Sequence, residues 1–193
     1  MQVSRYHPLL VALHWILAFF VIAALALGAF ALVKIPNTDP MKLEGLRSHM
    51  TGGILILILM LIRLFVRSRT AHPASATAGI LLLDRIAWVS HRALYAAVLG
   101  MAGSGLFMAL QTDLPSILFA GEGSLPADFW IFPIRTVHYL ISRLLMALIA
   151  LHVAAAFYHA LILRDGLLGR MFFGRRAIGD AASRSATALE KVS

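Results

Sequence analysis

Long uncharged stretches alternate with short polar ones along this chain, and four of the apolar stretches are long enough to cross a lipid bilayer. A helix needs roughly 20 consecutive apolar residues to span the hydrocarbon core. Because backbone groups in lipid must pair within their own segment, these stretches predict helices despite their many β-branched residues. The expected spans are about residues 9–33, 49–66, 87–110 and 134–163.

Composition supports an all-α integral membrane protein built as a four-helix bundle. Hydrophobic residues make up 60% of the 193 residues and charged residues only 13%, whereas soluble domains contain about 25% charged residues. The first span has about 25 apolar residues, more than the roughly 7–15 of a secretory signal, and is therefore interpreted as a membrane helix. The sequence contains no cysteine, which excludes disulfides, iron–sulfur clusters and covalent attachment of a c-type haem.

The distribution of Lys and Arg predicts how the helices are oriented. Cytoplasmic loops of membrane proteins are enriched in these residues, so the net charge of +8 points to cytoplasmic loops rather than to a nucleic acid partner. Twelve of the seventeen basic residues lie before the first span, around the connection between the second and third, or after the fourth. We therefore expect both termini in the cytoplasm, a membrane domain over residues 1–173 and a cytoplasmic tail over residues 174–193.

Six of the eight histidines lie within or at the ends of the expected spans. The alternating direction of the spans puts four of them in the cytoplasmic half and two in the outer half: His14, His91, His152 and His159, then His49 and His138. The other two, His7 and His72, fall outside the spans and are expected to be solvated.

The fourth span is the most informative because it carries three histidines. His138 and His152 are 14 residues apart, which is roughly 21 Å along a helix and within about 40° of one face. His159 follows seven residues later, within about 20° of that face. A lone membrane histidine is commonly a packing residue, but ionisable groups at this depth are costly and usually functional. Two layers of imidazoles are what two stacked metal centres need, and iron between two imidazoles suits electron transfer.

Two arginines and several glycines fit the same interpretation. Arg63 and Arg143 lie in spans that contain no Asp or Glu, so haem propionates would supply the missing anions. For Arg63, which is near a helix end, snorkelling to the interface is an equal alternative. Five glycines leave room for either a flat macrocycle or a neighbouring helix: Gly52, Gly53, Gly100, Gly103 and Gly105.

Four motifs in sequence order resemble the bacterial cytochrome b561 family, whose members are four-helix dihaem membrane proteins related to the cytochrome b subunits of nickel–iron hydrogenases. The motifs are LHW in the first span, HMTGG followed by Arg63 in the second, HRALY in the third, and VHYLISRLLMALIALHVAAAFYHALILRDGLLGRM in the fourth. The resemblance covers about residues 5–173. It implies two b haems between the four helices and electron exchange with the ubiquinone pool.

The resemblance also implies individual roles. Its axial ligands are His14 with His152 on the cytoplasmic side and His49 with His138 on the outer side. His159 corresponds to a histidine beside the quinone and could exchange a proton with it. His91 could replace an inner ligand, but we expect a propionate or quinone contact, since a third ligand would leave one of the others idle. Met50 and Met146 are weaker candidates for iron ligation than the four imidazoles.

The expected function is therefore a dihaem cytochrome b of the bacterial inner membrane, passing electrons between an outer donor and ubiquinone. A small donor such as superoxide would make the protein an oxidoreductase, and Lys42 with Arg47 would form a basic patch near His49 that attracts an anion. A protein donor would instead make the chain an anchor subunit of a dehydrogenase or hydrogenase-type complex; a homodimer is also compatible. The alternative from another class is a transporter with a histidine-lined path, which predicts no haem.

Overall fold

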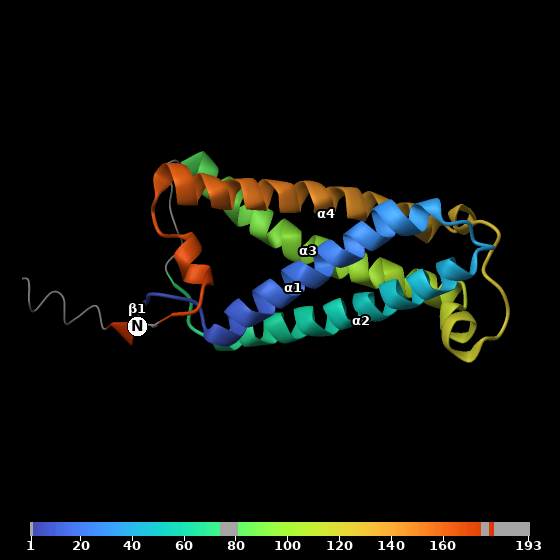
Figure 1. The fold of residues 1–193 in the computed structure, drawn as a ribbon. Helices are drawn as coiled ribbons and strands as arrows, with labels where there is room; N and C mark the ends of the chain where they lie inside the picture. Colours follow the sequence, from blue (N-terminus) through green and yellow to red (C-terminus); the bar gives the residue numbers. More distant parts are fainter. Residues whose placement is uncertain (1, 74–80, 175–177, 180–193) are drawn as a thin grey trace, which may run out of the picture.

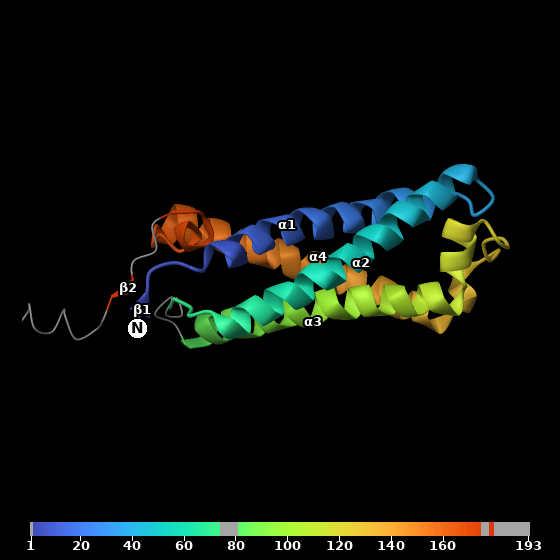
Figure 2. The same ribbon diagram turned by 90° about the horizontal axis from the view of Figure 1, so that it is seen from below.

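Four long helices lie side by side in an elongated bundle in the computed structural model, which describes residues 2–73, 81–174 and 178–179 (Figures 1 and 2). The helices are α1 (Pro8–Ala26), α2 (Pro40–Arg69), α3 (Leu81–Gln111) and α4 (Pro133–Phe157). The segments long and apolar enough to cross a membrane are Pro8–Lys34, Pro40–Arg69, Asp84–Gln111 and Pro133–Leu163. The prediction of an all-α protein with four membrane-spanning helices is confirmed.

The two ends of the bundle differ in what they hold. At one end, here called the terminal end, the chain enters α1 and leaves α4; at the other, the loop end, lie the connections over residues 35–39 and 112–132 (Figure 1). The shorter elements are β1 (Gln2–Val3), η1 (Leu27–Ala31), η2 (Leu32–Lys34), η3 (Ser116–Ala120), η4 (Phe129–Ile131), η5 (Tyr158–Leu163), η6 (Leu168–Met171) and β2 (Ile178–Gly179). β1 and β2 pair antiparallel, with Gln2 opposite Gly179.

Helix α2 begins nine residues before the predicted second span. The Asp39 carboxylate accepts a hydrogen bond of 2.8 Å from the amide of Met41, and Pro40 occupies the first helical position. An acidic N-cap followed by proline is a strong start signal for a helix. The prediction was wrong at this boundary because it counted only apolar residues, and the first turns of α2 carry charged ones.

His7 and His72 are not the solvated histidines that we expected. Both are half-buried, and Nδ1 of His7 accepts a hydrogen bond of 3.3 Å from the amide of Leu9, which caps the start of α1. The ring of His72 packs edge-on against Tyr6, with centroids 6.1 Å apart. These two residues therefore help to anchor the terminal end and lie outside the imidazole pairs described below.

The main core is an apolar layer across the middle of the bundle, to which all four helices contribute. Its buried members are Leu17, Val21, Leu25, Ile56, Met60, Ala97 and Leu145. Leu145, on α4, is only 1% exposed and lies seven residues from both His138 and His152. The layer thus lies between the depths of these two histidines and separates them by closely packed side chains.

Both ends are closed by hydrogen bonds to backbone carbonyls. At the loop end, Nε and Nη2 of Arg47 donate to the carbonyl of Leu118, at 2.9 and 2.6 Å. At the terminal end, Arg5 donates to the carbonyl of Gly169 at 2.7 Å and the indole of Trp15 donates to that of Met171 at 2.8 Å, which ties η6 to α1. Apart from Gly174 and β2, the predicted tail over residues 174–193 lies outside the described residues.

Candidate functional site

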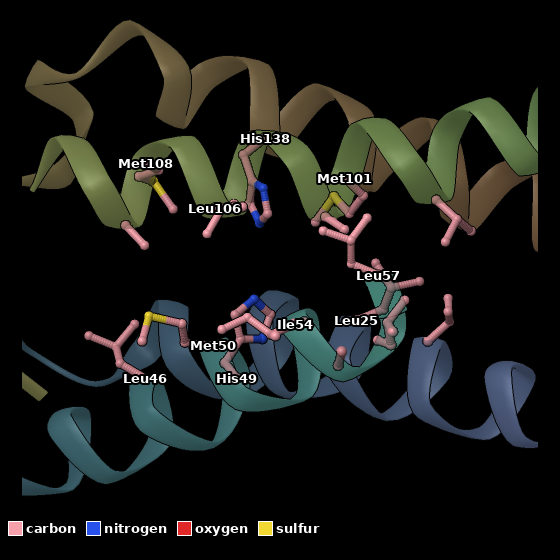
Figure 3. Close-up of a pocket in the computed structure, with 18 of the residues that line it drawn as sticks. Leu25, Leu46, His49, Met50, Ile54, Leu57, Met101, Leu106, Met108 and His138 are labelled. Atoms are coloured by element: carbon pink, nitrogen blue, oxygen red, sulfur yellow. The ribbon is translucent and has the colours of Figure 1, made fainter. Parts of the chain in front are cut away.

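The first candidate site is a cavity at the loop-end side of the apolar layer, entered by His49 from α2 and His138 from α4. Figure 3 shows the two imidazoles pointing into the cavity from opposite walls, with Met50, Met101 and Met108 around them. Their ring centroids are 6.3 Å apart and their planes are inclined by 82°. The cavity leaves a volume of about 100 Å³ for water-sized molecules and is lined almost entirely by apolar side chains. The imidazoles are the only ionisable groups among its lining residues.

Glycine packs against each imidazole of this loop-end pair. A Cβ atom added at Gly28 would lie 3.0 Å from Cε1 of His49, and one added at Gly105 would lie 3.1 Å from Cε1 of His138. Both positions are too close for a larger side chain without movement of the ring. Among the glycines singled out from the sequence, Gly105 touches a site imidazole, whereas Gly52 and Gly103 face open space. Gly28, in η1, carried no sequence signal and was missed.

The two loop-end imidazoles differ in their hydrogen bonds. Nδ1 of His138 lies 3.0 Å from the hydroxyl oxygen of Ser104, a buried residue of α3. Nδ1 of His49 is buried and makes no hydrogen bond of good geometry within the described part of the chain. Nothing in the sequence pattern singled out Ser104.

The second candidate site is at the terminal-end side of the apolar layer, where three imidazoles meet. His14 from α1 and His152 from α4 have ring centroids 6.3 Å apart and planes inclined by 76°. His91 from α3 lies closer to His152, with ring centroids 5.4 Å apart, and its Nδ1 lies 2.7 Å from the carbonyl oxygen of Ala87. Because a carbonyl only accepts, Nδ1 of His91 carries the proton.

The distances between ring centroids show which of these imidazole pairs could hold a metal ion between the two rings. Metal–imidazole nitrogen bonds are about 2.0–2.1 Å long, so rings on opposite sides of one metal ion have centroids roughly 6.3 Å apart. The pair His49–His138 and the pair His14–His152 both match this spacing, at 6.3 Å. His91 and His152, at 5.4 Å, are too close to hold a metal ion between their rings. The loop-end pair, with apolar walls and a glycine against each ring, fits a flat macrocycle that is ligated from two sides. The terminal-end pair shares the spacing of its rings.

The two arginines predicted to meet an anion lie in different surroundings. Arg63 is half-buried and donates to the carbonyl of Leu10 at 2.6 Å and to the hydroxyl of Tyr95 at 3.1 Å, so it links α2 to α1 and α3. No carboxylate pairs with it among the described residues. Arg143 is exposed, with its guanidinium 4.8 Å from the centre of the Tyr139 ring. Nine residues separate it from His152, about half a turn around the helix, and the structure does not bring it to either pair.

His159 lies beyond the terminal-end pair, in the π-helical turn η5. Its Nδ1 lies 2.5 Å from a carboxylate oxygen of Asp165, and its ring packs edge-on against Tyr158. Asp165 also accepts a hydrogen bond of 2.9 Å from the amide of Leu167. The hydrogen bond from His159 holds the pKa of the Asp165 carboxyl below its ordinary value. Sequence reasoning found His159 and missed its carboxylate partner.

The basic patch expected from Lys42 and Arg47 is not free to attract an anion. Lys42 is buried, and its ammonium donates to the carbonyls of Leu32 and Ile35 at 2.6 and 2.8 Å. It therefore stabilises the C-terminal end of the first span, where a cation is favoured. Arg47 is held by the carbonyl of Leu118 and by an ion pair with Glu44. The expectation failed because sequence proximity to His49 does not show which way a cation points.

A bundle of four membrane-crossing helices with facing imidazoles at two depths defines the class of membrane cytochromes that hold haem between helices. The family model for the prokaryotic cytochrome b561 matches residues 5–174, and the chain belongs to this family. It is also 25% identical over 187 residues to a protein of Yersinia pestis named probable superoxide oxidase CybB, covering 90% of this chain and 98% of that protein. The resemblance inferred from the motifs is confirmed: the chain is a multi-pass bacterial inner-membrane cytochrome that binds haem b and transfers electrons.

Proposed function

We propose that the chain binds two haem b groups, one at each imidazole pair, and passes single electrons across the bilayer between an outer donor and ubiquinone. The observation that carries this proposal is the shared spacing of His14 with His152 and of His49 with His138, 6.3 Å in both pairs. The two imidazoles of each pair would hold one haem, and a haem held in this way would supply single-electron transfer rather than substrate binding.

The chain's own contribution is to fix the imidazoles at two depths and to keep the space between them dry. His138 and His152 share one helix, which sets the separation of the two sites at roughly 21 Å. The apolar layer between them, with Leu145 nearly inaccessible, excludes water and ions. Electrons can cross such a layer whereas protons cannot, so charge separation across the membrane is maintained.

The terminal end is assigned to the cytoplasm and the loop end to the outside. Twelve of the seventeen Lys and Arg residues support this orientation by the positive-inside rule. At the terminal end, Arg63 and His91 are the candidates for binding haem propionates, since both lie near the pair His14–His152. Arg143 is left out of this set because it is exposed and its guanidinium lies over the Tyr139 ring.

Ubiquinone is assigned to the cytoplasmic side, near His159. Asp165 occupies Nδ1 of this imidazole, which leaves Nε2 to exchange a proton with a bound quinone. An imidazole suits this task because a ring nitrogen can either donate or accept a proton.

Superoxide is proposed as the outer donor, since the Yersinia pestis relative carries the name of a probable superoxide oxidase. One observation favours the alternative, an anchor subunit that receives electrons from a partner protein. Lys42 and Arg47 are both occupied by carbonyls, so they form no free basic patch that would collect a small anion. Rates of oxidation of superoxide and of reduced quinone by the purified protein distinguish the two. If the purified protein oxidises no small donor, the result would support the anchor subunit that receives electrons from a partner protein.

The proposal is tested by an absorbance spectrum and a haem-to-protein ratio for protein produced with ample haem. Two haems per chain are expected, and His138→Ala and His152→Ala should each remove one. A protein without a b-type band would overturn the proposal and support the histidine-lined transporter. Loss of neither haem in these variants would refute the assignment of ligands while leaving the family unchanged.

A further inference from the structure

The hydroxyl of Ser104 is shared between a backbone carbonyl and an imidazole. Its oxygen lies 3.0 Å from the carbonyl of Met101, one turn earlier in α3, and 3.0 Å from Nδ1 of His138 on α4. A serine hydroxyl has one proton to donate, and a carbonyl can only accept. With that proton directed to Met101, the oxygen can only accept from His138 through a lone pair, and Nδ1 of His138 is then the donor.

We propose that Ser104 is a positioning residue that holds His138 in the tautomer with the proton on Nδ1. In this tautomer Nε2 of His138 has a free lone pair that can bind a metal ion in the cavity. The ring of His49 faces it there, with the two ring centroids 6.3 Å apart. A hydrogen bond at the outer nitrogen fixes the orientation of a ligating imidazole and makes it a stronger electron donor to the metal. The inference rests on the proposed role of His138 as a haem ligand.

The surroundings of the two imidazoles make this hydrogen bond the distinguishing feature of the loop-end pair. Both rings pack against a glycine, Gly28 for His49 and Gly105 for His138, so their steric surroundings match. Ser104 gives His138 a side-chain partner at Nδ1. The imidazole of His49 instead meets a backbone carbonyl, that of Ala24, and its Nδ1 makes no hydrogen bond of good geometry among the described residues. The two ligands therefore differ in a side-chain hydrogen bond, and through it Ser104 lowers the reduction potential of the loop-end haem.

The test is a redox titration of haem-loaded Ser104→Ala, followed by absorbance. One of the two midpoint potentials should move to a more positive value, because a weaker imidazole donor stabilises the ferric state less, while the other stays unchanged. Ser104→Thr keeps a hydroxyl and should restore the wild-type value. If Ser104→Ala loses the haem altogether, Ser104→Cys, whose sulfur is a weak acceptor, should retain it with a smaller positive shift.

Ser142→Ala is the matched control. Ser142 is buried to a similar degree, at 8% exposure against 6% for Ser104, and its hydroxyl donates to the carbonyl of Tyr139 at 2.7 Å without touching a histidine. This variant should leave both potentials unchanged. An equal shift in Ser142→Ala, or no shift in Ser104→Ala with both haems bound, would overturn the role of Ser104.

Nitrogen-15 NMR of His138 separates failure of this inference from failure of the proposed function. In protein before haem loading, the spectrum should show the proton on Nδ1, and Ser104→Ala should reduce the population of that tautomer. A proton on Nε2 in the wild type would refute the inference whatever the haem content. Unchanged haem content in His138→Ala would instead refute the ligand assignment, and the tautomer measurement would still report on Ser104.

Discussion

The loop-end and terminal-end imidazole pairs share one spacing, but their surroundings are of different kinds. At the loop end, His49 and His138 enter an apolar cavity in which no other lining residue is ionisable, and a glycine packs against each ring. At the terminal end, a third imidazole, His91, adjoins His152. Arg63 lies near this end and links three helices.

This difference indicates that two kinds of interaction, steric packing at one end and hydrogen bonding at the other, produce the same ligand geometry in one bundle. The loop-end pair is held by shape, since its rings occupy space that any larger residue at the glycines would fill. The terminal-end pair is surrounded by directional contacts, because the helices there are joined by a charged hydrogen-bond donor. Steric substitutions should therefore damage the loop end selectively, and substitutions that remove charge should damage the terminal end.

The largest effect is expected from filling the glycine contact of the loop-end pair. Gly105→Val places methyl groups where Cβ alone would already lie 3.1 Å from the ring of His138. The imidazole must rotate or α3 must move away from α4, and either change removes the ligand geometry. We expect loss of about one of two haems, measured as the haem-to-protein ratio, with the terminal-end haem retained.

Gly103→Val is the matched control on the same helix. A Cβ atom there would meet nothing within 4 Å, so both haems should remain. Equal loss in the two variants would show that valine disturbs α3 in general. It would contradict the steric account of the loop end.

The second effect is destabilisation of the terminal end by Arg63→Leu. This substitution removes charged hydrogen bonds to the carbonyl of Leu10 and the hydroxyl of Tyr95. Such bonds contribute about 1.5–3 kcal/mol each, and a loss of that size lowers Tm by roughly 3–12 °C in a chain of this length. Thermal unfolding in detergent measures it. The control is Arg143→Leu, at an exposed position over Tyr139, which should change Tm by about 2 °C or less. Comparable shifts of Tm in the two variants would contradict the structural role given to Arg63.

Features encoded within one segment could be predicted from the sequence. The four spans follow from apolar length, and the shared face of His138 and His152 follows from their separation of 14 residues on one helix. The start of α2 was also encoded locally, in the capping pair Asp39 and Pro40. It was missed because the search for spans ignored the charged turns that follow.

Features that depend on contacts between helices could not be predicted. Ser104 and His138 are 34 residues apart, and Gly28 packs against His49 of another helix. No periodicity in the sequence indicates such pairs, since packing between helices decides them. The direction in which a long basic side chain points also depends on contacts with other segments. Lys42 donates to a carbonyl of the preceding segment, and the guanidinium of Arg143 lies over the Tyr139 ring.

A smaller effect is expected at the third imidazole. His91 is exposed and too close to His152 to share a metal ion with it, so His91→Ala should retain both haems. Its absorbance spectrum should match the wild type in the position of the b-type band. His14→Ala is the comparison variant and should lose the terminal-end haem. If His91→Ala loses a haem and His14→Ala does not, the ligand pair at this end is His91 with His152.

The smallest effect concerns the segment that follows α4, which the Asp165 carboxylate joins to His159 and to the amide of Leu167. The pKa of Asp165 is lower in the folded protein than its ordinary value of 3.8, chiefly because of the hydrogen bond from His159. A carboxyl group whose pKa is lowered by folding stabilises the folded state at pH values above its ordinary pKa. This contribution disappears as the pH falls through the pKa that the group has in the folded protein. Hydrogen exchange of the Leu167 amide should therefore be slow at neutral pH and lose its protection in acid.

Asp165→Asn should speed exchange of the Leu167 amide at neutral pH by roughly two- to five-fold, because an exposed ion pair contributes little. It should also remove the loss of protection in acid. Asp128→Asn is the control, since Asp128 caps η4 at the loop end through a hydrogen bond of 2.8 Å from the amide of Trp130. That variant should leave Leu167 unchanged. Wild-type protection that persists in strong acid would mean that Arg5 and Trp15, rather than Asp165, order this segment through their bonds to Gly169 and Met171.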